Sequence, residues 1–106
     1  MATLDDFKKI ELKVAEILSA EAHPNADRLF VLKIKIGEEL RQIVAGIRQH
    51  YTAEELPGKK IIVVANLDPA VIRGVESQGM LLAASDGMTL AVVTPERPIA
   101  SGGQVK

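Results

Sequence analysis

Short apolar runs with a two-residue period, separated by turn residues, limit most strongly what this chain can fold into. From Leu29 to Ile36, apolar residues at every second position alternate with valine and lysine. Ile10 to Leu18 alternates in a similar way, with a slip of phase near Ala15 that indicates a bulge. Successive side chains of a strand point to opposite faces, so both segments are predicted to be strands with one buried face.

The other segments favour a small barrel. Leu40 to Ile47 returns after a turn at 37–39, which predicts a hairpin with the preceding strand. Thr52 and Glu55 form a capping box that opens a helix of barely one turn. The remaining predicted elements are a short helix at 3–9, strands at 60–65, 80–84 and 89–93, and a C-terminal extension at 94–106.

This order predicts an all-β fold in a single domain, residues 1–106. Five or six short strands with a brief helix between the third and fourth are typical of the OB-fold, a five-stranded Greek-key barrel. We expect that barrel to carry short helices and the C-terminal extension. An SH3-like or other small barrel is the main competitor, and the position of the helix favours the OB-fold.

Composition disfavours an enzyme. The chain has no cysteine and two histidines, His23 and His50, which we expect to be surface or capping residues rather than metal ligands. No serine has the G-x-S-x-G setting of a nucleophile, and no glycine-rich loop precedes Lys-Ser or Lys-Thr. We therefore predict no catalytic site, no metal and no cofactor. Without a signal peptide or a long apolar run, the predicted location is cytoplasmic.

A connection of fourteen residues, Asn66 to Gly79, separates two nearly continuous apolar runs. A plain hairpin needs two to five residues, so a connection of this length predicts a binding surface or a covered edge. Asn66 interrupts the first run, and its side chain suits either a ligand or the backbone groups at a strand end.

The charge distribution says more than the net charge of −1. Residues 1–27 carry three basic and six acidic groups, residues 28–73 carry eight and five, and residues 74–106 carry two and three. The central segment therefore has a balance of +3, between ends of −3 and −1. Such a zone suits a phosphate-facing patch or, equally simply, a solvated strand face.

Six motifs follow one another in a recognisable order. They are Asp6-Phe7-x-Lys9-Ile10-x-Leu12-x-Val14-Ala15, Ala22-His23-Pro24-Asn25-Ala26-Asp27-Arg28-Leu29, Arg41-Gln42-Ile43-Val44-Ala45-Gly46-Ile47, Tyr51-Thr52-x-Glu54-Glu55-Leu56-x-Gly58-Lys59, Val64-Ala65-Asn66-Leu67 and Ser77-x-Gly79-Met80-Leu81-Leu82-Ala83-Ala84. Together they resemble the tRNA-binding domain family. That family includes the C-terminal domain of bacterial methionyl-tRNA synthetase and free-standing structure-specific tRNA-binding proteins.

The resemblance implies an OB-fold that binds tRNA by shape and assists aminoacylation without being catalytic. It implies tRNA contact by Ser77 and Met80, from the Ser-x-Gly-Met segment, and by Arg28 with Asn25 beside it. Charge and position add Lys33, Arg41, Arg73 and Asn66 as further candidates. Arg73 is the only basic residue of the long connection, so the neighbouring strands are expected to supply most of the charge.

Further expectations concern partners and alternative functions. An apolar stripe of Leu4, Phe7 and Ile10 predicts a homodimer. The resemblance implies methionyl-tRNA synthetase as a partner. The alternative function is that of a CsaA-type export chaperone, which uses the same fold to bind unfolded polypeptide. A generic single-strand binder is disfavoured, because such proteins stack bases on aromatic rings and this chain has only Phe7, Phe30 and Tyr51.

Overall fold

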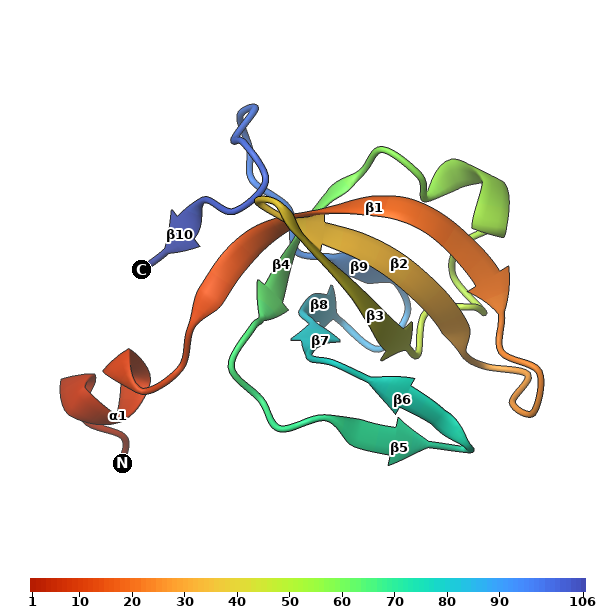
Figure 1. The fold of residues 1–106 in the computed structure, drawn as a ribbon, viewed down its shortest axis with the longest axis horizontal. Coiled ribbons are helices and arrows are strands. Elements are labelled where there is room, and N and C mark those ends of the chain that lie inside the picture. Colours follow the sequence, from red (N-terminus) through yellow and green to blue (C-terminus); the bar gives the residue numbers. More distant parts are fainter.

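A computed structural model describes all residues from 1 to 106. Its main sheet is antiparallel, with the strand order β3-β2-β1-β4-β7 and with β10 paired to β1 (Figure 1). These strands are β1 (Leu12–Ala22), β2 (Phe30–Ile36), β3 (Glu39–Ala45), β4 (Lys60–Val64), β7 (Met80–Leu81) and β10 (Gln104–Val105). Two small hairpins join β5 (Ala70–Ile72) to β6 (Val75–Ser77) and β8 (Ala83–Ser85) to β9 (Leu90–Val92). The helices are α1 (Leu4–Lys8) and the 3₁₀ turn η1 (Ala53–Glu55).

The long strand β1 sets the curl of the sheet. Its first half, Leu12–Glu16, pairs with β4, and its second half, Glu16–Ala22, pairs with β2 on the other edge. The register shifts between Ile17 and Ser19, so the bulge lies a little later than the predicted slip near Ala15. A bulge bends a strand and increases its twist, which lets β1 pass from one side of the barrel to the other.

The first and last strands of the chain are neighbours. Leu12 lies opposite Val105 and Lys13 lies opposite Gln104. Val14 extends this pairing, because its N–H donates to the Gly103 carbonyl at 2.8 Å. The C-terminal extension is therefore anchored on β1.

The core follows from the alternation in the sequence. The burial pattern of β2 alternates residue by residue, with Phe30, Leu32, Ile34 and Ile36 inside and Lys33 exposed. β4 is buried on both faces from Ile61 to Val64. The twelve residues of the core cluster are aliphatic apart from Phe30, and η1 closes one end through Leu56, which is fully buried.

The predicted all-β class and the helix between the third and fourth strands are confirmed, while several boundaries change. β1 runs to Ala22, well beyond the predicted Leu18, and β3 ends at Ala45 rather than Ile47. The run 80–84 divides into β7 and β8 at Leu82, whose N–H donates to the Ile62 carbonyl at 3.0 Å. The long connection is not an open loop, because it contains the β5–β6 hairpin.

Candidate nucleic-acid interface

Two segments far apart in sequence meet at one end of the barrel: the turn after β1 and the tip of the β5–β6 hairpin (Figure 1). His23 joins them. Its Nε2 lies 3.0 Å from the Ile72 carbonyl oxygen, and its Nδ1 accepts the Asn25 backbone N–H at 3.0 Å. A carbonyl only accepts and an amide N–H only donates, so the ring in this arrangement is neutral with its proton on Nε2.

The position of His23 corrects the prediction of a surface or capping histidine. The side chain is 3% exposed, whereas His50 is exposed as expected. The hairpin tip covers the ring, and both ring nitrogens have partners, so burial leaves no polar atom of the ring unsatisfied. His23 therefore fixes where the hairpin docks.

The hairpin tip has an unusual backbone. Arg73 has φ = 52° and Gly74 has φ = 89°. Two successive positive φ angles are the mark of a type I′ turn, in which Asn or Gly is the usual first residue. Arg73 is held in this conformation by Asn25, whose Nδ2 donates to the Arg73 carbonyl at 3.4 Å, while Arg73 Nη2 donates to the Asn25 carbonyl at 3.4 Å.

A hollow of about 360 Å³ lies between this tip and the turn. Its walls are Ala26, Asp27, Arg28, Leu29 and Arg73. Arg28 and Arg73 are both exposed, and neither forms an ion pair within the chain. Two unpaired guanidinium groups on one hollow suit a phosphate, because each group can donate two parallel hydrogen bonds to its oxygens.

Side chains link β3 to residues 76–79, a contact that we call the seam. Ser77 Oγ accepts the Val44 N–H at 2.9 Å and donates to the Gly79 carbonyl at 2.9 Å. The Gln78 N–H donates to the Gln42 carbonyl at 2.8 Å, and the Gln42 N–H donates to Gln78 Oε1 at 3.0 Å. Ser77 is 3% exposed, so its hydroxyl serves the seam and does not face solvent.

Arg41 closes the seam at its other end. It lies opposite Ile34 in the register, on the side of β3 that faces the barrel interior. Its Nη1 donates to the Ala65 carbonyl and, at 3.5 Å, to the Gln78 carbonyl. Its Nε pairs with Glu39 at 2.7 Å, and this hydrogen bond is the main cause that lowers the pKa of Glu39 below its usual value. Arg41 is thus largely committed to internal contacts.

Lys33 and Met80 face outward. Lys33 is exposed on β2, where its Nζ donates to the side chain of Gln42 across the hairpin. Met80 is 46% exposed at the outer edge of the sheet, although it begins an apolar run. Both side chains are accessible to a ligand.

Asn66 has the structural role that the sequence left open. Its Nδ2 donates to the Lys9 carbonyl at 2.7 Å, and its Oδ1 accepts the Glu11 N–H at 2.8 Å. These bonds attach the segment after α1 to the end of β4. They use one amide N–H and the carbonyl oxygen of the side chain.

The structure therefore brings Arg28, Asn25 and Arg73 together. Lys33 lies on β2, the strand that follows the turn with Asn25 and Arg28.

Sequence reasoning missed Gln42 and Gln78. A glutamine at a polar strand position looks the same in the sequence whether it lies in the seam or on the open surface. No group of three or more potential metal ligands is present. No helix of the chain is long and apolar enough to cross a membrane.

Residues 12–104, nearly the whole barrel, match the sequence profile described as "Putative tRNA binding domain". The chain belongs to the tRNA-binding domain family. A family relative, methionine–tRNA ligase of Thermotoga maritima, is 54% identical over 103 residues, which are 97% of this chain and 16% of that protein. The tRNA-binding domain thus spans only a small part of the curated relatives that it matches.

Solved structures of similar size confirm the OB-type fold of the domain. A methionyl-tRNA synthetase-related protein from Pyrococcus horikoshii has a TM-score of 0.92 and 36% identity, with 100% of this chain and 98% of that chain covered. The CsaA chaperone protein of Picrophilus torridus has a TM-score of 0.92 and 30% identity, with both chains fully covered. The fold is therefore shared by proteins named for two different functions.

Proposed function

We propose that this chain is a non-catalytic, structure-specific tRNA-binding domain that assists aminoacylation. The observation that carries the proposal is the pair of exposed, unpaired arginines, Arg28 and Arg73, on one hollow. With few aromatic rings available, contacts to phosphate and sugar give recognition by shape rather than by base sequence. Membership of the tRNA-binding domain family supports tRNA as the RNA concerned.

The candidate residues have two kinds of role in this proposal. Arg28, Asn25, Arg73, Lys33 and Met80 contact tRNA, because their side chains are exposed on the turn, the hairpin tip and the sheet edge.

Ser77, Arg41 and Asn66 act indirectly, because their polar atoms bond to the protein backbone. Ser77 and Arg41 hold the seam, and Asn66 holds the end of β4 to the segment after α1. His23 belongs with them, because it docks the hairpin that carries Arg73.

Fluorescence anisotropy with labelled tRNA, and with duplex and single-stranded RNA of equal length, tests this proposal. We expect tRNA to bind most tightly. Arg73→Gln should weaken tRNA binding and reduce the slope of log K against log salt by about 0.9, one phosphate contact on a duplex. Lys8→Gln, on α1, is the matched control for loss of a charge, and its sedimentation is compared with that of the wild type because α1 also carries exposed apolar residues. Equal affinity for all three RNAs would refute recognition by tRNA shape.

We also propose a homodimer in the cytoplasm. α1 buries none of its residues, and Leu4, Phe7 and Ile10 are 67%, 46% and 42% exposed. Three large apolar side chains on one short segment are costly in water, and a second copy would cover them. Sedimentation at micromolar concentration should give a species of twice 11.4 kDa, and a single species of 11.4 kDa would exclude the dimer. Methionyl-tRNA synthetase is the proposed partner enzyme.

A chaperone function like that suggested by the name of the Picrophilus torridus protein is the alternative. Its best support is the same exposed apolar segment near α1, which suits an unfolded polypeptide as well as a second copy. A separate anisotropy titration with a labelled, reduced and unfolded model protein separates the two functions. The tRNA-binding proposal expects tRNA to bind and the unfolded protein not to bind at the same concentrations, and the reverse result would favour the chaperone function.

A further inference from the structure

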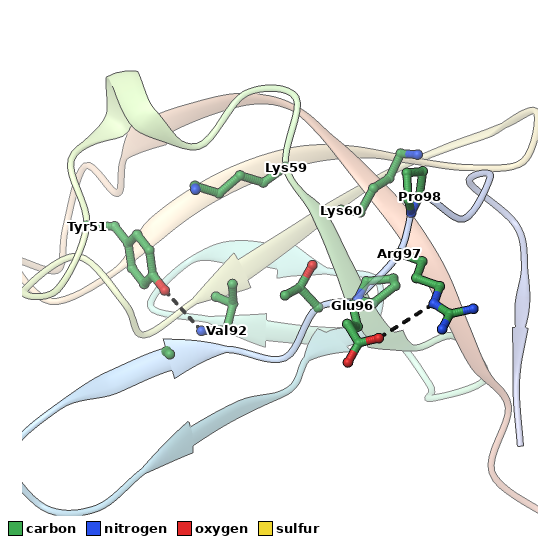
Figure 2. A pocket seen from close by; sticks show the side chains of 10 residues that line it. Tyr51, Lys59, Lys60, Val92, Glu96, Arg97 and Pro98 are labelled. Atoms are coloured by element: carbon green, nitrogen blue, oxygen red, sulfur yellow. Dashed lines mark hydrogen bonds and ion pairs between the residues drawn. The ribbon is translucent and has the colours of Figure 1, made fainter.

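A second and larger hollow, of about 540 Å³, lies between the start of β4 and the segment that follows β9 (Figure 2). Its walls include Tyr51, Lys59, Lys60, Val92 and residues 94–98. None of the residues proposed above to contact tRNA lines it. Its volume is within the range of sites for small molecules, about 300 to 1,000 Å³.

The charge of this hollow favours an anion. Lys59, Lys60 and Arg97 face it, with Glu96 as the only carboxylate. Glu96 pairs with Arg97 at 3.6 Å, but both side chains are largely exposed, so the pair is weak. Lys60 Nζ donates one hydrogen bond, to the Ile99 carbonyl at 2.8 Å, and an ammonium group has three donors.

Lys59 is the most available of the three cations. It is exposed and has no ion-pair partner. The nearby Glu55 carboxylate accepts the Thr52 N–H and hydroxyl at 2.8 and 3.0 Å and attracts Lys59 only over a longer range. The N–H donors of the Lys59 ammonium are therefore available to a phosphate.

Tyr51 supplies a flat wall beside these cations. It is the only tyrosine of the chain, and its ring packs against the core. Its hydroxyl accepts the Val92 N–H at 3.0 Å, which fixes the ring (Figure 2). Figure 2 shows Tyr51 and Lys59 toward one end of the hollow, with Lys60, Arg97 and Pro98 toward the other. An aromatic ring beside cations is the combination that binds a base and its phosphate together.

We infer that this hollow binds one unpaired nucleotide, with the base against Tyr51 and the phosphate on Lys59, while Lys60 and Arg97 add positive charge at the other end of the hollow. Free nucleotides and RNA share this chemistry. The inference rests on the proposed function only in naming RNA as the source of the nucleotide. It gives the domain a second RNA contact, separate from the Arg28–Arg73 hollow.

The fluorescence of the protein reports directly on this site. The chain has no tryptophan and one tyrosine, so its intrinsic fluorescence comes from Tyr51. Uridine monophosphate, uridine and tRNA are titrated, with correction for their absorption. The monophosphate and tRNA should quench Tyr51, and uridine should quench it much more weakly because it lacks the phosphate.

Lys59→Gln should lower the affinity for uridine monophosphate and for tRNA about three- to fivefold, as expected for loss of an exposed ion pair. It should also lower the salt slope for tRNA by about 0.7, the value for one phosphate on a single strand. The matched control Lys8→Gln should change neither quenching nor affinity at this site, and its sedimentation should equal that of the wild type because α1 also carries the proposed dimer surface. Both lysines are exposed, so neither variant should disturb folding.

The outcomes separate this site from the proposed function. One outcome is that tRNA binds by anisotropy, leaves Tyr51 fluorescence unchanged and has the same affinity for Lys59→Gln as for the wild type. In that case the second site is refuted and the tRNA proposal stands. If uridine monophosphate quenches Tyr51 while tRNA does not bind, RNA is refuted as the source of the nucleotide and the tRNA proposal fails. Quenching by uridine equal to that by its monophosphate would refute the phosphate contact.

Discussion

Loss of a single buried hydroxyl should open the seam. Ser77→Ala removes the acceptor of the Val44 N–H and the donor to the Gly79 carbonyl, each at 2.9 Å. A buried polar group left without a partner costs about 1 to 3 kcal/mol. We assign about 2 kcal/mol to the N–H and about 1 to the carbonyl, which tolerates an unused lone pair better. The expected loss is therefore about 3 kcal/mol, a large share of the 5 to 15 typical of a domain.

Urea unfolding followed by circular dichroism measures this loss. The midpoint should fall with an unchanged m-value, and the melting temperature should fall by about 12 °C or more. Ser85→Ala is the matched control, because the Ser85 hydroxyl accepts the Gly87 N–H at 3.1 Å on an exposed turn where water can replace it. It should change stability by less than about 0.5 kcal/mol. A loss below about 1 kcal/mol in Ser77→Ala would refute the seam as a stabilising contact.

Three other predictions are more direct. Gly79→Ala should destabilise the domain by at least about 2 kcal/mol in urea unfolding, because φ is +121° and a Cβ would lie 2.8 Å from the Val64 carbonyl oxygen; wild-type stability would contradict this. Met80→Ala should weaken tRNA binding in the anisotropy assay without lowering the melting temperature by more than a few degrees, since the side chain is 46% exposed. The hydrogen bond from the Thr52 N–H is the main cause that lowers the pKa of Glu55 from 4.5. The ionised Glu55 carboxylate therefore stabilises the fold above pH 4.5, and this stabilisation is lost as the pH falls through the lower pKa of the folded state. Glu55→Gln should accordingly flatten the fall of melting temperature below about pH 4.5, and an unchanged acid limb would argue against it.

The parts of the fold that repeat a local rule were predictable. The alternation of apolar residues predicted the buried face of β2 correctly. A strand with one buried side must place its apolar residues at every second position. The 3₁₀ turn η1 follows from its Thr52–Glu55 hydrogen bonds and ends before Pro57.

The β5–β6 hairpin escaped prediction because its turn is Arg73-Gly74, and Arg does not signal the type I′ geometry that Asn-Gly would. The burial of His23 depends on Ile72, which lies 49 residues further along the chain. The Ser-x-Gly-Met segment was predicted as a ligand contact, and the structure divides it: Ser77 is buried in the seam and Met80 is exposed. Contacts between distant segments decide the burial of His23 and of Ser77, and no local pattern contains them.

The pairing of β10 with β1 has a consequence for how the barrel can be connected to other proteins. Because Leu12 lies opposite Val105, the chain enters and leaves the sheet at points that are roughly 5 Å apart. A short peptide between them would therefore make a circular permutant, with new ends opened in the exposed turn at 86–88. The same geometry would let the barrel be inserted into a surface loop of a host enzyme while both connections run from one edge of the sheet.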